Sequence, residues 1–281
     1  MADEISGINM IVTQGGTAIT DQSDATLTST PELAESVVKN TNFPNRLPGD
    51  QNWSVDLETQ IPTDGGEDAL VNGNAGLEVE LDLDDDGTPS YERVSGVQSL
   101  TLSLSQELSE VPPGISEATG WDYFVPLRQS WETDAEAHYY DPANDDVYAA
   151  IHDARENGNA LPGRVTILGV EMDGDLVADD FEIAAGTDDP ATQSLPMMGS
   201  GQVAQTNSFE STIESLVSLF FNQSTATIGL QHETDGSVAT GSTLWSGDAY
   251  LESAEITLER NSFPVLSATF QGDGPLSRTT Q

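Results

Sequence analysis

Two stretches of the sequence, Thr26-Leu-Thr-Ser-Thr-Pro-Glu-Leu-Ala-Glu35 and Thr101-Leu-Ser-Leu-Ser-Gln-Glu-Leu-Ser-Glu110, follow the same pattern. In both copies an aromatic-led segment follows and leads to a tryptophan, Trp53 in the first and Trp131 in the second. Polar and apolar residues alternate after each tryptophan, as in a strand with one buried face. Internal similarity of this kind marks a repeated structural unit, so we expect a duplication with both tryptophans as core anchors rather than stacking platforms. Chance similarity between two Ser/Thr-rich strands is the alternative.

The similarity continues past the tryptophans. We expect a second strand to close each copy, at Leu77–Leu83 in the first and at Arg164–Val170 in the second. The sequence therefore predicts two units in tandem: residues 1–96, which include an N-terminal arm, and residues 97–281, which include the C-terminal closing strands.

A long loop is predicted within the second unit, at residues 185–207, where glycine and proline recur. Loops longer than about 15 residues are usually functional or disordered. Leu195, Met197 and Met198 lie near its middle, where apolar side chains would be wasted in solvent. We therefore predict that these three residues dock on a neighbouring molecule during self-assembly.

Two helices are predicted among many strands. One runs from about Asp145 to Asn157, where apolar residues recur at helical spacing and Gly158 stops the helix. The other spans Thr212 to Phe221, with Ser211 and Glu214 as a capping box. The fold class that follows is mainly β, with at most one helix packed on each unit.

The charge balance is extreme, because 48 Asp plus Glu against 8 Lys plus Arg leave a formal net charge of −40 on 281 residues. Such a chain repels itself at low ionic strength, since the Debye length is about 10 Å at 0.1 M salt and about 3 Å at 1 M. The simplest interpretation is a protein made for molar salt in a halophilic host. An apolar content of 36% and the strand-like alternation argue against disorder. No basic cluster suits a cationic groove for nucleic acid.

No residue constellation indicates catalysis. His138, His152 and His232 share no metal-ligand spacing with one another or with paired carboxylates. The stretch Asp82–Gly87 begins like a calcium-binding EF-hand loop, but Arg93 occupies the twelfth position, where a bidentate Glu is required, so we interpret it as an acidic turn. The chain contains no cysteine and no nucleophile-elbow, Walker or dinucleotide motif. We therefore predict no catalytic residue, no cofactor and no metal site, and hence no enzyme.

The N-terminus, Met1-Ala-Asp-Glu-Ile-Ser6, has neither the basic start nor the apolar run of a signal peptide. No apolar stretch approaches the ~20 residues of a membrane span. We expect a soluble protein made in the cytoplasm of its host.

Several segments taken together carry a resemblance to a known family. They are the stretch that contains the first tryptophan, a Tyr-Asp-Pro segment that leads into the first helix, and a C-terminal pair of strands with its closing Gly-Asp-Gly-Pro-Leu: Leu47–Glu58, Tyr140–Tyr148, Gly247–Leu258 and Phe263–Leu276. They resemble the major tail tube proteins of long-tailed, siphovirus-like phages and of haloarchaeal tailed viruses. The C-terminal 30 residues resemble the family most closely.

The resemblance implies a tail-tube-type β-sandwich or half-barrel with a flanking helix, tandemly duplicated here. In the family, six single-domain subunits form a ring whose sheets line a channel, and rings stack into a tube through which the genome leaves. Two units in one chain raise the alternative of three chains in a pseudo-sixfold ring. The implied partners are further copies of the chain, other tail proteins, and viral DNA that passes through the lumen without specific binding. The implied location is the virion tail.

Two other functions remain open on the sequence. The chain could be another tail component, such as a terminator or a baseplate ring protein, since these share the β-sandwich. It could also be a free halophilic β-sandwich module that binds carbohydrate or a partner protein. Mass separates the second alternative from the rest, because a binding module stays small in solution whereas a tube subunit forms rings or polymers.

Overall fold

The structure is a computed structural model of the chain. It describes residues 10–15, 17–19, 22–36, 45–61, 70, 74–82, 88–111, 121–180, 182–185, 190–206, 211–234, 237–238 and 243–280. Over these ranges strands dominate, as predicted. The elements are β1 (Met10–Gln14), β2 (Thr17–Ala18), β3 (Gln22–Ser36), β4 (Asn45–Gln60), β5 (Ala75–Leu81), β6 (Ser90–Arg93), β7 (Val97–Glu110), β8 (Phe124–His138), α1 (Asp146–Asn157), β9 (Ala160–Ile167), β10 (Val170–Ala178), β11 (Ile183–Ala184), β12 (Thr192–Thr206), α2 (Ser211–Asn222), β13 (Thr225–Thr234), β14 (Ser237–Val238), β15 (Thr243–Glu259), β16 (Val265–Gly272) and β17 (Ser277–Thr280).

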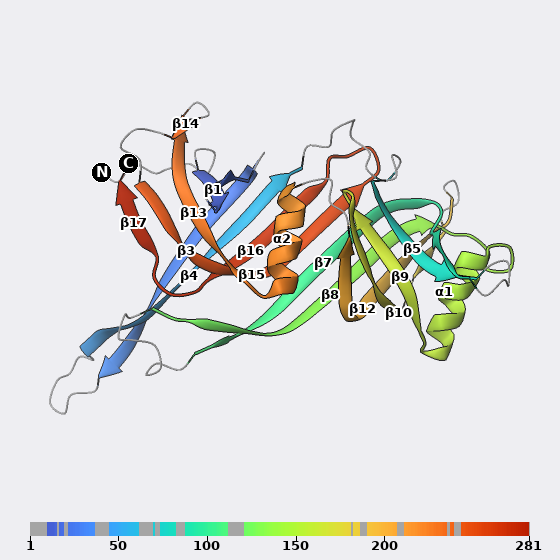
Figure 1. The fold of residues 1–281 in the computed structure, drawn as a ribbon, viewed down its shortest axis with the longest axis horizontal. Coiled ribbons are helices and arrows are strands. Elements are labelled where there is room, and N and C mark those ends of the chain that lie inside the picture. Colours follow the sequence, from blue (N-terminus) through green and yellow to red (C-terminus); the bar gives the residue numbers. More distant parts are fainter. Residues whose placement is uncertain are drawn as a thin grey trace.

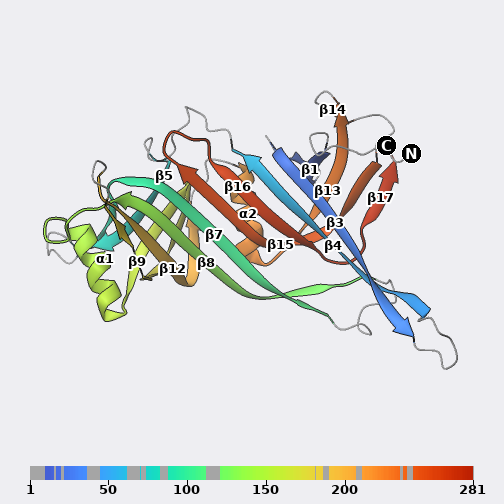
Figure 2. The same ribbon diagram turned by 180° about the vertical axis from the view of Figure 1, so that it is seen from behind.

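The strands form one large antiparallel sheet that runs along the molecule (Figure 1). Its central strands lie side by side in the order β3, β4, β16, β15, β7, β8, β12 (Figure 2). From β12 the sheet continues through β10, β9, β5 and β6. From the first half of β15 it continues through β13, β1 and β2. Helix α2 packs near β15, and α1 packs on β9 and β10 at one end of the molecule.

Alternation along the strands accounts for the core. In β8, Trp131, Thr133, Ala135 and Ala137 are buried, and the residues between them are exposed. A strand directs successive side chains to opposite faces, so this pattern buries one face of the sheet and leaves the other in solvent. Apart from Ala154, the buried apolar residues of the described ranges form a single contiguous cluster. The two tryptophan anchors predicted from the sequence, 2% and 5% exposed, both belong to it.

The long hairpins β3–β4 and β7–β8 match each other pair for pair. Ser29 lies opposite Trp53 in the first, and Leu104 lies opposite Trp131 in the second. Each hairpin has two register shifts, and these fall at corresponding places. On the first strand of each hairpin they lie at Gln22/Asp24 and Pro31/Leu33, and at Val97/Ser99 and Gln106/Leu108. The similarity between the two stretches in the sequence thus reflects one backbone geometry that occurs twice.

The two helices and the strands after them also correspond. Both helices were predicted from the sequence, and Asp145 caps α1 by accepting hydrogen bonds from two backbone N–H groups. The residue after each helix is left-handed, Gly158 with φ 65° and Gln223 with φ 50°. The N–H of the residue that follows, Asn159 or Ser224, donates to a carbonyl oxygen of the last helical turn in both cases. Helix α1 leads into β9 and α2 leads into β13 with the same geometry.

Each tryptophan rests on a glycine of the neighbouring strand. Gly199 in β12 and Gly272 in β16 occupy equivalent places, since they pair with Leu176 and Ala249 on the next strands. A Cβ atom on Gly199 would lie 1.8 Å from Cε2 of Trp131, and one on Gly272 would lie 2.2 Å from Cε2 of Trp53. Real Cβ atoms do not approach other atoms so closely, so the indole rings need bare backbone at these two places.

The two equivalent sets of elements are nested in the chain. The split set consists of β1–β4 together with α2, β13, β15 and β16. The inserted set consists of β5–β8, α1 and β9–β12, and it lies between the two parts of the split set. The tandem order predicted from the sequence is therefore corrected to an insertion of one set into the other.

The division expected between residues 96 and 97 is not the one that the strand pairing follows. Leu77 of β5 lies opposite Val165 of β9, Leu57 of β4 lies opposite Ala268 of β16, and β1 pairs with β13, so three strand pairs cross that boundary. The strand predicted at Arg164–Val170 is interrupted by a turn, since β9 ends at Ile167 and Val170 begins β10. The strands β5 and β9, which begin the two closing strands predicted to be equivalent, are instead neighbours within the inserted set. Alternation shows which face of a strand is buried but does not identify the strand beside it.

The loop predicted at residues 185–207 is also corrected, because most of it is the strand β12. The first part of β12 pairs with β8 and its second part pairs with β10. Pro196 and the glycines of this stretch indicated a loop, yet Pro196 lies opposite Asp134 within the sheet. The neighbouring strands β8 and β10 supply hydrogen-bond partners for the backbone of β12, and the local sequence does not show that these strands lie beside it.

Candidate functional site: an acidic face of the sheet

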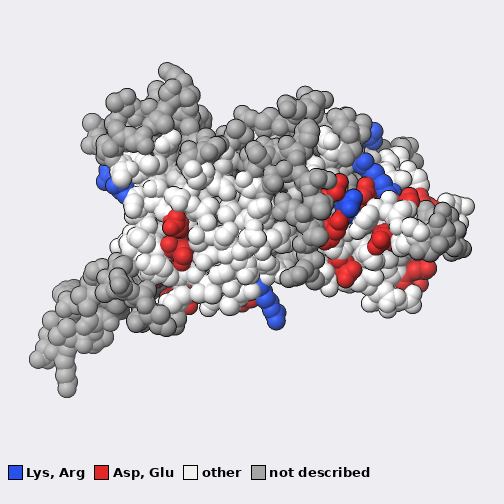
Figure 3. All heavy atoms as spheres, viewed as in Figure 1, with Lys and Arg blue, Asp and Glu red and all other residues white. Residues whose placement is uncertain are grey.

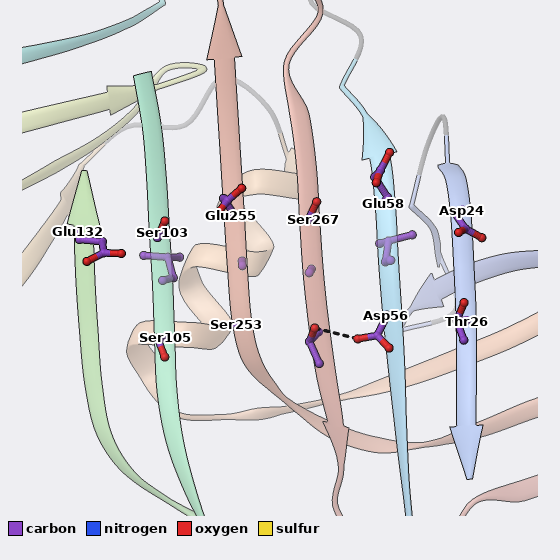
Figure 4. A pocket seen from close by; sticks show the side chains of 15 residues that line it. Asp24, Thr26, Asp56, Glu58, Ser103, Ser105, Glu132, Ser253, Glu255 and Ser267 are labelled. Atoms are coloured by element: carbon purple, nitrogen blue, oxygen red, sulfur yellow. Dashed lines mark hydrogen bonds between the residues drawn. The ribbon is translucent and has the colours of Figure 1, made fainter. Parts of the chain in front are cut away.

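One face of the central sheet carries carboxylate and hydroxyl side chains on neighbouring strands. Along β4, Asp56 and Glu58 alternate with the buried Val55 and Leu57. The neighbouring strands follow the same alternation, so their polar side chains point to the same side. Figure 4 shows them together on the adjacent strands β3, β4, β16, β15, β7 and β8, with helix α2 behind the sheet.

A groove runs across this face where the split set meets the inserted set. Its lining is made of carboxylates, hydroxyls and a few aliphatic residues, and it contains no lysine or arginine. The lining residues are Asp24, Thr26, Asp56, Leu57, Glu58, Ser103, Leu104, Ser105, Glu132, Ser253, Ala254, Glu255, Ser267, Ala268 and Thr269. Thr269 donates a hydrogen bond from Oγ1 to Oδ1 of Asp56 at 2.9 Å (Figure 4).

A second groove continues the same face over the inserted set, again without a cation in its lining. It is lined by Ser99, Thr101, Asp134, Glu136, Glu182, Ala184, Thr192 and Ser194. The pairing registers make Asp134 and Glu136 the counterparts of Asp56 and Glu58. Each set therefore places the same two carboxylates at the same points of the sheet, and we name the whole surface the acidic face.

The carboxylates on this face repel one another. Partial burial raises the pKa of Asp134 above its ordinary value, and the neighbouring charge of Glu136 raises it further. A carboxyl group whose pKa is raised in this way holds its charge at a cost in free energy. The face therefore stores negative charge that no cation lining the two grooves neutralises.

The arginines for which the structure gives ion pairs lie elsewhere. Arg164 of β9 donates from Nε to Oδ1 of Asp173 at 2.6 Å and lies 3.4 Å from Glu171. Arg155 of α1 pairs with Asp180 at 2.6 Å. Figure 3 shows the α2 side of the molecule, where charged side chains of the described residues gather mainly at the α1 end and the middle is mostly uncharged. The negative charge is thus not spread evenly over the described surface.

The three residues predicted to mediate self-assembly lie on two different faces of β12. Leu195 and Met197 are each 2% exposed, because they point from β12 into the core of the chain itself. Met198 points the other way and is 48% exposed, so it alone of the three can contact another molecule. The error has the same origin as the loop prediction, since in a strand an apolar residue needs no outside partner.

The histidines and the EF-hand-like stretch considered from the sequence are only partly described. Within the described ranges, no three His, Cys, Asp or Glu residues are grouped so that they could hold a metal ion. Residues 83–87 of the EF-hand-like stretch lie outside the described part. Over the part of the chain that the structure describes, no helix is long and apolar enough to cross a membrane.

These observations define an antiparallel β protein built from two equivalent sets of strands that share one acidic face. No protein-family model matches the chain, and no curated protein matches it in sequence. Among solved structures, it is similar to a chain of the virion of a native gene transfer agent particle, with 16% identity over 52% of this chain and 99% of the other, at a TM-score of 0.41. It is equally similar to a chain of the tail of an empty gene transfer agent particle with C6 symmetry, at the same identity, coverage and TM-score. It is also similar to the SPP1 tail tube, with 13% identity over 56% of this chain and 86% of the other, at a TM-score of 0.39.

Proposed function

We propose that this protein is a structural subunit of a viral tail tube, the conduit through which a genome is ejected, and that it has no catalytic role. The observation that carries the proposal is the acidic face, whose two grooves are lined by residues of both sets of strands. Carboxylates and hydroxyls line both grooves of this face, and neither lining contains a lysine or an arginine. The face is therefore suited to form part of the wall of a channel.

The chemistry of the face fits the passage of DNA. Duplex DNA carries one phosphate charge per ~1.7 Å of its axis, and proteins that bind it do so through lysine and arginine. A wall of Asp, Glu, Ser and Thr repels the phosphates and keeps the helix centred. Viral DNA can therefore slide past the acidic face without binding to it. Helix α2 lies on the opposite side of the sheet and would face outward.

The two equivalent sets favour a ring of three chains, in which six sets surround the channel. Rings built from head-to-tail contacts close when the rotation between neighbours divides a full turn. Each ring would stack on further copies of itself and meet other tail proteins at the two ends of the tube. The subunit would be made in the cytoplasm of the host and would reside in the virion tail.

The charge of −40 supports a halophilic host for such a virus. Carboxylates lining a channel from several chains repel one another strongly unless salt screens them. At molar salt the Debye length is about 3 Å, so each carboxylate acts only on its near neighbours. Assembly should therefore need molar salt.

The proposal is tested by electron microscopy of the purified protein in about 2 M salt. Hollow rings or tubes with three chains and six lobes per ring are expected. Six chains per ring would keep the function and reject the three-chain arrangement. Discrete rings that never stack would favour a terminator or baseplate ring protein, and a dispersed monomer at every protein concentration would favour a binding module.

Site-specific labels test which face lines the channel. The chain lacks cysteine, so Ser267→Cys places a single thiol on the acidic face and Ser215→Cys places one on the exposed side of α2. Maleimide-gold on the first variant should appear inside the ring, and on the second it should appear outside. Label from Ser267→Cys on the outer wall would refute the assignment of the acidic face to the lumen.

A further inference from the structure

The joint between the two sets inside one chain is a strand pair. The second half of β15 pairs antiparallel with β7, from Ser253 opposite Ser105 to Glu259 opposite Ser99. This pairing makes the acidic face continuous from one set to the other. It also seals the core, because Ile256 lies opposite Leu102 and both are 1% exposed or less.

Both strands of this joint have counterparts elsewhere in the chain. The counterpart of β7 is β3, as the matched hairpins establish. The counterpart of the second half of β15 is β11. Ala184 lies opposite Thr192 in one set, and Thr257 lies opposite Val265 in the other. Thr192 and Val265 are equivalent places, because each lies the same number of residues before the glycine that contacts a tryptophan, Gly199 or Gly272.

The two counterpart strands have no such joint within the chain. In the described residues β3 pairs with β4 alone, and β11 pairs with β12 alone. Each therefore offers one open edge, on the side where its counterpart is joined. Open edges are templates for pairing with another chain, and natural proteins usually protect them.

We propose that β11 of one copy of this protein pairs with β3 of the next copy, in the antiparallel register that joins β15 to β7. Transfer of that register places Ile183 opposite Leu27, with Glu182 opposite Thr28 and Ala184 opposite Thr26 of the neighbour. The inference deepens the proposed function, since it rests on ring formation and specifies the joint that closes the ring.

Exposure of the side chains supports this pairing. Ile183 is 45% exposed, although its counterpart Ile256 is 1% exposed because β7 covers it. Ile183 is thus an apolar side chain in the place of a core residue, without the strand that would cover it. On the opposing edge, Leu27 is only partly buried, whereas its counterpart Leu102 is fully buried. Both asymmetries disappear if one copy covers the next.

The polar face fits as well. Within the chain, Glu255 and Ser103 lie opposite each other and both line the groove of the acidic face. Their counterparts, Glu182 and Thr28, are exposed residues of the same face in the two sets. The transferred register therefore keeps the acidic face continuous from one copy to the next. A shift by one residue would direct these side chains to the other face.

Disulfide trapping tests the register directly, because the chain has no cysteine of its own. The test variant carries Glu182→Cys and Thr28→Cys. Opposed residues on antiparallel strands have Cα atoms about 4.5–5.5 Å apart, within the range of about 4.4–6.8 Å that a disulfide spans. The control within one chain carries Glu255→Cys and Ser103→Cys. The out-of-register control carries Glu182→Cys and Asp24→Cys, displaced by roughly 13 Å along the strand at about 3.4 Å per residue.

The variants are assembled in about 2 M salt, oxidised and separated on a denaturing gel without reductant. The test variant should give covalently linked chains up to the number in one ring, the Glu255/Ser103 control should give a monomer with an internal disulfide, and the out-of-register control should give neither. Assemblies seen by microscopy without linked chains, or with equal linkage in the out-of-register control, would overturn the joint and leave the tube function standing. A monomer that neither assembles nor cross-links would overturn both.

A pair of substitutions distinguishes an effect on assembly at the proposed joint from an effect on the stability of the fold. Ile183→Thr should leave the melting temperature of the dispersed protein unchanged and raise the concentration needed for assembly by about tenfold, as loss of one buried aliphatic side chain implies. Ile256→Thr, at the equivalent place inside the chain, should lower the melting temperature. An unchanged assembly concentration for Ile183→Thr would contradict the proposal.

Discussion

Replacing Gly199 by alanine tests whether the tryptophan and glycine contacts hold the sheet together. The new Cβ would lie 1.8 Å from Cε2 of Trp131 and 2.2 Å from Nε1 of the same ring. Ordinary contacts are about 3.5–4.0 Å, so the indole or the backbone of β12 must move by roughly 2 Å. Neither is free to move, because Trp131 is 5% exposed and β12 is paired on both sides.

Overpacking of a core costs about 1–3 kcal/mol, and this displacement places Gly199→Ala at the upper end, about 3 kcal/mol. The alanine regains about 0.4–1 kcal/mol by restricting the unfolded chain, so the net loss is roughly 2 kcal/mol. For a domain of this size the melting temperature should fall by about 4 °C. The measurement is thermal unfolding followed by circular dichroism in molar salt, with Ser200→Ala on the exposed side of the same strand as the control.

A double-mutant cycle identifies the cause. In a Trp131→Leu background the indole is gone, so Gly199→Ala should cost less than about 0.5 kcal/mol. The equivalent substitution Gly272→Ala should behave like Gly199→Ala, because its Cβ would lie 2.2 Å from Cε2 of Trp53. A loss that is unchanged in the Trp131→Leu background would refute the reasoning.

Three further predictions concern individual side chains. Trp53→Phe should lower the free energy of unfolding, measured by urea titration, by about 1 kcal/mol more than Trp131→Phe does. The reason is that Nε1 of Trp53 donates to the carbonyl oxygen of Gly274 at 3.0 Å, whereas the buried Nε1 of Trp131 has no hydrogen-bond partner among the described residues. Asp134→Asn should raise the free energy of unfolding at pH 7 by less than about 1 kcal/mol, because burial raises the pKa of this carboxyl in the fold and its charge is held there at a cost. The gain should vanish as the pH falls below about 4, where this carboxyl is protonated in the unfolded chain as well. Arg164→Gln should lower the free energy of unfolding by about 1–2 kcal/mol, because it removes the bidentate pair with Asp173 and the longer contact with Glu171. Equal losses at 0.2 M and 2 M salt would argue against an electrostatic origin.

Local patterns in the sequence predicted the individual elements well. Both helices appear within a residue or two of their expected ends, since apolar spacing, an Asp cap and a C-terminal glycine act within a few residues of one another. The alternating strands appear as well, and both tryptophans are buried. Each of these features is decided by which side of a short segment is apolar.

The local patterns that predicted the elements did not predict which strands pair with one another. An alternating strand is complementary to any other alternating strand, so Leu77–Leu83 and Arg164–Val170 looked equivalent when they are in fact neighbours. The similarity near Thr26 and Thr101 located the duplicated hairpin. It could not show that one set of strands is inserted into the other, because that order depends on pairs more than 200 residues apart, such as Leu57 with Ala268.

The sequence by itself determined the composition of the acidic face, an excess of carboxylates and hydroxyls with few cations, and the alternation that turns them away from the core. Only the tertiary structure decided that these side chains meet on one surface, that Leu195 and Met197 are buried, and that Ile183 is exposed. The physical reason is that burial depends on the neighbouring strand. Hydrogen bonding between strands is nearly indifferent to side-chain identity, so the choice of neighbour is made by the packing of the whole sheet.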